Sequence, residues 1–216
     1  MEVIALVKRK EYLHRLIQWK DEQLIKVVTG IRRCGKSTML MQYQEWLKDN
    51  NISDEQIISI NFEDLEYEEL QDYQKLYDYL KHRLCKGKMT YIFLDEIQKV
   101  PSFEKVVDSL YIKADVDIYI TGSNAYMLSG DLATLLTGRY VEIKMLPLSF
   151  KEFLEICKMD QERGLTEYMR VGGLPYIATM DRTQEKLETY LEGIYNTVIV
   201  KDIEDRQARK GSVRCV

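Results

Sequence analysis

The octapeptide GIRRCGKS at Gly30–Ser37 constrains this chain more than any other feature of its sequence. It fits the pattern G-x-x-x-x-G-K-[ST] at every fixed position, and each fixed residue has a physical role. Gly30 and Gly35 allow the tight turn in which consecutive N–H groups point at phosphate oxygens. Lys36 supplies a cation for the β- and γ-phosphates, and Ser37 offers a hydroxyl to Mg²⁺ at the start of a helix. The motif therefore predicts a phosphate-binding loop for a nucleotide such as ATP.

The other positions of this loop have weaker chemical signals. We expect Ile31, Cys34 and Thr38 to line the bound phosphates mainly through their backbone. Arg32 and Arg33 could contact phosphate or a neighbouring chain, or could be solvated and pair with nearby acids. The sequence alone leaves both interpretations of the two arginines open.

Short apolar runs of strand length alternate with segments of helical spacing before Pro147. The runs are Leu24–Thr29, Gln56–Asn61, Thr90–Asp95, Val116–Thr121 and Tyr140–Met145. The first four lack a clean polar alternation, as expected for strands buried on both faces. The segments with helical spacing are Lys36–Lys48, Leu70–Cys85, Phe103–Ala114 and Asn124–Leu136. This alternation predicts an α/β fold with a mainly parallel sheet and helices on both sides.

The pattern changes after Pro147, because from there only helices are predicted. They span Phe150–Lys158, Gln161–Met169 and Thr183–Val200. We therefore expect an α/β core over residues 1–147 and a small helical lid over residues 148–216. The charged tail from Lys201 has no obvious stop signal, so it either frays or continues into a longer protein.

Composition excludes several classes of function. No apolar run approaches the roughly 20 residues of a membrane span, and the N-terminus does not resemble a secretory signal. We therefore expect a cytoplasmic protein with no membrane association. The four cysteines are scattered and the chain has two histidines, which suggests neither a zinc site nor a disulfide framework. The net charge of -4 argues against a protein that coats nucleic acid.

Two carboxylates follow the apolar run Tyr91–Leu94. Because ligands gather at the carboxyl ends of parallel strands, Asp95 is expected to face Mg²⁺, through a bound water, and Glu96 to orient an attacking water. A small-molecule kinase has less use for Glu96, and a GTPase would normally have an Asn-Lys-x-Asp motif, which is missing from this sequence. The acids of Asn61–Asp64 could contact the nucleotide, but a turn cap is the favoured interpretation.

Two further positions are candidates for contacts with the γ-phosphate. Ser123 and Asn124 follow a predicted strand and could hydrogen-bond the phosphate or the attacking water, but both are also favoured helix caps. Arg139 could act as a finger that stabilises transition-state charge, in cis or from a neighbouring subunit. The alternative is an exposed arginine that pairs with Asp131 or Glu142.

The phosphate loop, the Asp-Glu strand end and the Ser-Asn strand end together resemble the AAA+ ATPases. More narrowly, the chain resembles a prokaryotic family of predicted ATPases with an AAA-type N-terminal domain and an uncharacterised C-terminal domain. The matching segments are GIRRCGKST (Gly30–Thr38), NFED (Asn61–Asp64), FLDEIQ (Phe93–Gln98), TGSNAYML (Thr121–Leu128), TGRYVEIKMLPLSFKEF (Thr137–Phe153), GGLP (Gly172–Pro175) and YNTVIVKDI (Tyr195–Ile203).

This resemblance implies a five-stranded parallel sheet in the order 5-1-4-3-2, followed by a helical lid. It implies phosphate and Mg²⁺ roles for Lys36 and Ser37, with Asp95 and Glu96 as the Walker B pair. Ser123 or Asn124 would then be sensor 1, and Arg139 a finger candidate. The sequence departs from the family at Cys34, where Ser or Val is more usual, and we find no sensor 2 arginine. Family members continue beyond residue 216, which implies a missing C-terminal domain.

The sequence thus favours a Mg²⁺-dependent ATPase that couples hydrolysis to a conformational change. The first alternative is an ATP/ADP-gated switch that does not hydrolyse, and the second is a small-molecule kinase. A DNA partner has no support beyond the Lys and Arg residues near the C-terminus. The sequence identifies no protein partner and leaves a homo-oligomer open.

Overall fold

The computed structural model describes residues 9–123, 136 and 138–196. The chain divides into two compact units. One unit contains residues 8–31 and 35–145 and is called the core unit below. The other contains, among the described residues, 146–196 together with 32–34, and its helical part is called the lid unit.

The core unit is built on a five-stranded sheet of β1 (Ile25–Gly30), β2 (Ile57–Asn61), β3 (Thr90–Asp95), β4 (Val116–Ser123) and β5 (Tyr140–Met145). The strand order is β2-β3-β4-β1-β5, and every neighbouring pair is parallel. This confirms the predicted α/β fold and the predicted order. Because the strands are parallel, the loops that leave β1, β3 and β4 emerge at one edge of the sheet.

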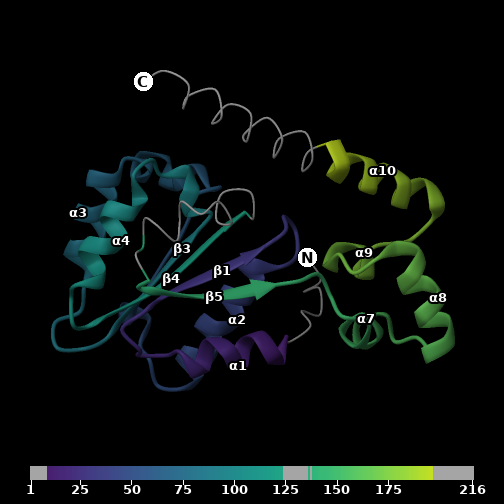
Figure 1. The fold of residues 1–216 in the computed structure, drawn as a ribbon, viewed down its shortest axis with the longest axis horizontal. Coiled ribbons are helices and arrows are strands. Elements are labelled where there is room, and N and C mark those ends of the chain that lie inside the picture. The colour runs from purple at the N-terminus through teal and green to yellow at the C-terminus, as the bar shows by residue number, and fades with distance from the viewer. Residues whose placement is uncertain (1–8, 124–135, 137, 197–216) are drawn as a thin grey trace. The chain divides into compact units, whose positions relative to one another are not determined.

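Helices cover both faces of this sheet (Figure 1). On one side are α1 (Lys10–Gln18) and α2 (Lys36–Asp49), and on the other are α3 (Tyr73–Arg83) and α4 (Phe103–Tyr111). Short 3₁₀ turns occur at η1 (Asp54–Gln56), η2 (Leu65–Gln71) and η3 (Ile97–Lys99). The helix α1 was not predicted, and the segment predicted as one helix from Leu70 to Cys85 is the end of η2 followed by α3. The predicted helix Asn124–Leu136 lies almost wholly outside the described residues.

The two faces of β3 have different partners, as the two-residue period of a strand requires. On one face Ile92 and Leu94 join the main apolar core, which includes Leu76 of α3 and Val107 of α4. On the other face Phe93 stacks on Tyr119 of β4 at 4.9 Å between ring centroids. Both faces are buried, which explains why the strand sequence shows no polar alternation.

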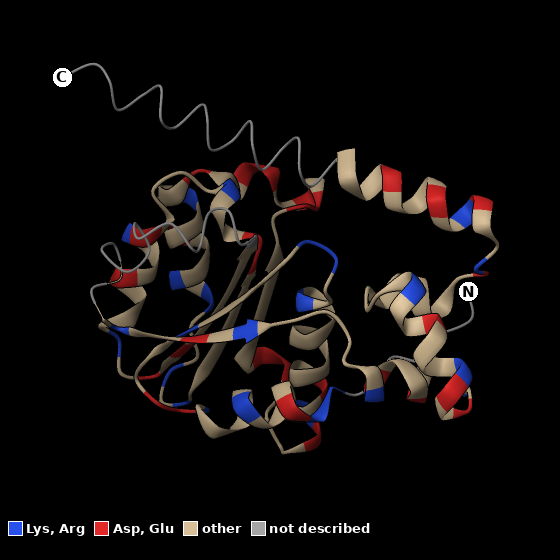
Figure 2. Cartoon of the chain, turned by 45° about the vertical axis from the view of Figure 1, so that its right-hand side comes forward, with Lys and Arg blue, Asp and Glu red and all other residues tan. Residues whose placement is uncertain are grey.

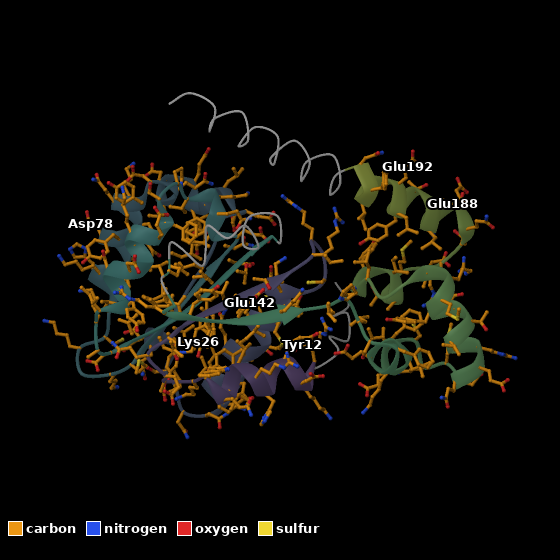
Figure 3. The ribbon with its side chains drawn as sticks, in the orientation of Figure 1. Tyr12, Lys26, Asp78, Glu142, Glu188 and Glu192 are labelled. Atoms are coloured by element: carbon orange, nitrogen blue, oxygen red, sulfur yellow. The ribbon has the colours of Figure 1, made fainter. Side chains whose placement is uncertain are left out.

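A charged pair is buried on the same face as Tyr119. Lys26 of β1, labelled in Figure 3, donates to Asp117 of β4 at 2.6 Å, and both side chains are almost completely buried. Tyr119 donates to the second carboxylate oxygen of Asp117 at 2.9 Å, and the hydroxyls of Tyr43 and Tyr119 lie 2.9 Å apart. Burial raises the pKa of both tyrosines, so their hydroxyls stay protonated and available as donors.

The lid unit consists of α7 (Phe150–Cys157), α8 (Gln161–Val171), α9 (Pro175–Thr179) and α10 (Gln184–Ile194) in its described part. A capping box between Ser149 and Glu152 starts α7. Gly173 allows close approach of the chain, since a Cβ atom there would lie 2.4 Å from the carbonyl oxygen of Leu148. The helix α9 was not predicted. Acidic and basic side chains both occur on helices of each unit (Figure 2).

No helix among the residues described above combines the length and apolar character needed to cross a membrane.

Removing one partner of the buried pair should destabilise the core unit strongly. We expect Asp117→Asn to lower the free energy of unfolding by about 3–5 kcal/mol, because Lys26 is left charged and unpaired in the core. Asp54→Asn is the matched control, since Asp54 pairs with Lys48 at the surface, and this change should cost less than about 1 kcal/mol. Urea denaturation measures both, and equal effects would contradict the prediction.

Candidate functional site

The phosphate-binding loop joins β1 to α2, as the sequence predicts. β1 ends at Gly30, and α2 begins at Lys36 directly after Gly35. Gly35 has φ 100°, and Arg33 also adopts a left-handed conformation with φ 65°. These angles produce the sharp turn that places the N-terminus of α2, with its unpaired N–H groups, beside the loop.

The side chains of the loop differ in exposure. Cys34 is fully buried, whereas Ile31 is exposed at 42% and Arg33 is also exposed. In the first turn of α2, Ser37 is exposed and Thr38 is half-buried. The buried Cys34 fits the expectation that this position contributes through its backbone. Arg32 is half-buried.

Lys36 lies almost buried within the loop. Its ammonium donates to the carbonyl oxygens of Gly30 at 3.3 Å and Ile31 at 3.4 Å. The same nitrogen lies 3.7 Å from Oε1 of Glu96, and the side chain of Lys36 is 4% exposed. Glu96 follows β3, so the structure brings the loop cation and the second acid together, although they are far apart in the sequence.

The two acids are held differently. Asp95 is the last residue of β3, is 8% exposed and accepts a hydrogen bond on Oδ1 from the hydroxyl of Thr121. Glu96 has φ 54° and ψ 44°, a left-handed conformation that is unusual for a residue with a side chain. Its N–H donates to the same Thr121 hydroxyl at 3.0 Å. The turn after β3 thus directs the Glu96 carboxylate towards Lys36.

Gln98 of η3 makes a further contact with the Glu96 carboxylate. Its Nε2 donates to Oε2 of Glu96, so that Gln98 and Lys36 face different oxygens of this carboxylate. The amide oxygen of Gln98 is buried without a hydrogen-bond partner in the described part of the chain. Glu96 is therefore oriented by two side chains and by its own backbone turn.

The donor set at this edge fits Mg²⁺ in chemical type. Mg²⁺ is usually held by one or two protein oxygens together with phosphate and water, and Ser37 and Asp95 supply a hydroxyl and a carboxylate. The described residues contain no cluster of three or more His, Cys, Asp or Glu side chains suited to a metal. The hydroxyl of Ser37 and the carboxylate of Asp95 fit a Mg²⁺ ion that is also bound by nucleotide phosphates.

The sensor candidates fall at the edge of the described residues. The backbone of Ser123 pairs with that of Gly30, so the end of β4 lies beside the start of the phosphate loop. Asn124 lies outside the described residues. The choice between the two as sensor, and their alternative role as helix caps, stays a prediction.

Arg139 lies at the amino ends of the strands, whereas the phosphate-binding loop of its own chain lies at their carboxyl ends. Its carbonyl accepts from the N–H of Ile25 at 2.9 Å, at the start of β1, whereas the loop begins at Gly30 at the other end. The five residue steps from Ile25 to Gly30 along β1 separate these ends by about 17 Å. The guanidinium lies 3.7 Å from Asp108 and 5.3 Å from the ring centroid of Tyr111.

This position affects two of the expectations for Arg139. A role of Arg139 as a finger for the nucleotide of its own chain does not fit the geometry, because the length of β1 lies between Arg139 and the phosphate loop. Among the described residues the acidic partner of Arg139 is Asp108, not the suggested Glu142, whose carboxylate accepts from Thr29 at 2.5 Å. Asp131, the other suggested partner, lies outside the described residues. A role of Arg139 in trans stays a prediction.

Asn61 at the end of β2 and Asp64 after it act as caps, which agrees with the favoured interpretation of Asn61–Asp64. Asn61 accepts from the N–H of Glu63 at 2.9 Å, and Asp64 accepts from the N–H of Glu66 at the start of η2. Neither contact points to a role in nucleotide binding.

Sequence reasoning missed two residues of this site, Thr121 and Gln98. Thr121 was assigned only to a strand and to a resembling segment, and Gln98 only to a resembling segment. A signal for Thr121 was present, because a hydroxyl near the end of a buried strand needs a partner among neighbouring strand ends. No comparable signal existed for Gln98, whose position depends on the turn after β3.

Comparison with known proteins supports the assignment of this site to nucleotide binding. The family model described as "AAA domain" matches residues 22–154. An uncharacterized protein of Haemophilus influenzae is 42% identical over 212 residues, which cover 95% of this chain and 52% of that protein. The uncharacterized protein MJ1544 of Methanocaldococcus jannaschii is 32% identical over 222 residues, covering 93% of this chain and 48% of that protein. The chain thus spans about half the length of these curated relatives.

Solved structures share the fold at low sequence identity. The Walker-type ATPase PABY2304 of Pyrococcus abyssi aligns with a TM-score of 0.60 and 15% identity, covering 96% of this chain and 77% of that one. A closed state of Hsp104 with ATPγS and FITC casein aligns with a TM-score of 0.54 and 13% identity, covering 77% of this chain and 32% of that one. The family match spans more than half of the residues and coincides with the sheet and its phosphate loop, so the chain belongs to the AAA domain family, whose fold binds nucleotides.

Proposed function

We propose that this chain is a Mg²⁺-dependent ATPase in which water attacks the γ-phosphate of ATP. The observation that most favours this function is the approach of Lys36 and Glu96, with 3.7 Å between the ammonium nitrogen and a carboxylate oxygen. A phosphate-binding cation and a candidate base for water meet at one buried position. The fold is that of the Walker-type ATPase PABY2304, which is consistent with this function.

Each side chain has a separate task in the proposed reaction. Lys36 and the N–H groups at the start of α2 bind the phosphate oxygens. Glu96 orients the water and accepts its proton as the bond from water to the γ-phosphorus forms and the bond from that phosphorus to the β–γ bridging oxygen breaks, which releases ADP. Ser37 and Asp95 would hold Mg²⁺, which, when bound, neutralises charge on the β- and γ-phosphates. The almost buried Lys36 and Glu96 make this position poorly accessible to other water.

The lid unit supplies the proposed output. AAA-type resemblance implies that helices after the sheet change position with the bound nucleotide, and we assign this role to α7–α10. The coupling, the protein partner and any larger assembly are part of this proposal. Interspersed charges and a net charge of -4 give no reason to propose DNA as the partner.

Removing the loop cation should abolish tight binding. We expect Lys36→Ala to weaken ATP affinity at least tenfold, because a charge-assisted contact to phosphate is lost. Titration calorimetry with ATP and Mg²⁺ measures this, with Lys99→Ala as the matched control, since Lys99 is an exposed lysine on η3. ATP affinity equal to that of the control variant would exclude the loop as the ATP site.

Replacing the candidate base should separate binding from turnover. We expect Glu96→Gln to retain ATP affinity and to lower kcat by about 10²–10⁴-fold, because the amide cannot accept the proton of water. Phosphate release measures kcat, and Glu63→Gln serves as the control at an exposed acid near the same edge. If the unmodified protein binds ATP and releases no phosphate, the nucleotide-gated switch becomes the better proposal.

If Arg139 acts as a finger on the nucleotide of a neighbouring subunit, two variants that are each inactive should complement one another when mixed. We expect Arg139→Ala to lower kcat by about 10³-fold or more, and a mixture of Arg139→Ala with Glu96→Gln to regain turnover that neither shows alone. Mixing Lys36→Ala with Glu96→Gln is the control, because both changes damage the same site and no gain is expected. Full turnover of Arg139→Ala would rule out the finger.

A further inference from the structure

Thr121 connects the two acids of the proposed site through one hydroxyl. Its Oγ1 donates to Oδ1 of Asp95 and accepts from the N–H of Glu96 at 3.0 Å. Thr121 is fully buried on β4, so no bulk water competes for these bonds. A threonine hydroxyl can donate one bond and accept another, and here both contacts go to consecutive residues of a neighbouring segment.

The backbone of Glu96 needs such a contact. Its φ of 54° lies in the left-handed region, where a residue with a side chain is strained unless its surroundings hold it there. The bond from the Glu96 N–H to Thr121 is one such restraint. Because this turn aims the carboxylate at Lys36, a change at Thr121 alters the direction of Glu96 without touching its side chain.

The position of Thr121 in the sheet explains why it can do this. Within β4, Thr121 pairs with Val28 of β1, and the preceding Ile120 pairs with Leu94 of β3. The strand that bears Thr121 therefore lies between the strand of the acids and the strand of the phosphate loop. A shift of β4 relative to β3 would therefore change the hydrogen bonds that the Thr121 hydroxyl makes with Asp95 and Glu96.

We propose that Thr121 is a positioning residue that sets the orientation of both Asp95 and Glu96 for Mg²⁺ and for the attacking water. This rests on the proposed ATPase function and deepens it. The hydroxyl fixes which oxygen of Asp95 remains available to the metal, and it holds the turn that directs Glu96. Thr121 touches neither substrate nor metal in this proposal, so it acts through the two acids.

The test compares Thr121→Val with Thr121→Ser. Valine keeps the shape of threonine and loses the hydroxyl, whereas serine keeps the hydroxyl and loses the methyl group. Thr90→Val is the matched control, because Thr90 is also fully buried and its hydroxyl also accepts from a backbone N–H, that of Cys85, at the other end of β3. Comparing the three variants therefore distinguishes the effect of losing the hydroxyl at this position from the effect of losing any buried threonine hydroxyl.

Two quantities are measured on each folded variant. The first is kcat for phosphate release, and the second is the factor by which Mg²⁺ strengthens ATP binding in calorimetry. We expect Thr121→Val to lower kcat about 10–100-fold with little change in KM, and to reduce the Mg²⁺ effect on affinity, as outer-shell changes commonly do. Thr121→Ser should stay within about threefold of the unmodified protein, and Thr90→Val should match it.

Three results would overturn the proposal. These are equal behaviour of Thr121→Val and Thr90→Val, a serine variant as defective as the valine variant, or a loss confined to KM. Should the valine variant fail to fold, Thr121→Cys replaces it, since a thiol fits the space and is a weak donor. If the unmodified protein shows no turnover, the ATPase proposal fails, and the Mg²⁺ effect on ATP affinity alone then decides the role of Thr121.

Discussion

Backbone pairing of β4 with β1 on one side and β3 on the other determines where every proposed group lies. The loop cation follows β1, the acids end β3, and the hydroxyl between them belongs to β4. Parallel strands place these ends at one edge, so residues distant in sequence meet without any long connection. The apolar core on one face and the aromatic cluster with its buried ion pair on the other hold this arrangement.

Much of this arrangement was predictable, because its signals are local. The loop Gly30–Ser37 and the acids Asp95 and Glu96 are short motifs whose residue types are dictated by phosphate and metal chemistry. The strand order was predictable only through the family resemblance, since strand lengths alone do not give neighbours. Two described helices were missed: α1, which has no side-chain cap at its N-terminus, and α9, which spans only Pro175–Thr179 although Pro175 stands at its first turn.

The remaining parts of the site depend on tertiary geometry. Arg139 was assigned from its place before a strand, and only the register of β5 against β1 shows that it lies at the far edge from the loop. The contact of Gln98 with Glu96 depends on a left-handed turn that a glutamate seldom adopts, so no propensity argument would predict it. The sequence indicates which chemical groups are available, and the pairing of strands decides which of them meet.

The buried pair of Lys26 and Asp117 has a consequence for this edge as well. Asp117, Tyr119 and Thr121 alternate along β4, so they point to the same face of the sheet. Sliding β4 by a single residue would turn all three to the opposite face, moving a carboxylate away from its ammonium and into an apolar core. The ion pair thus fixes the register of β4. The energetic penalty for misalignment at Asp117, at one end of β4, keeps the Thr121 hydroxyl at the other end in contact with Asp95 and Glu96.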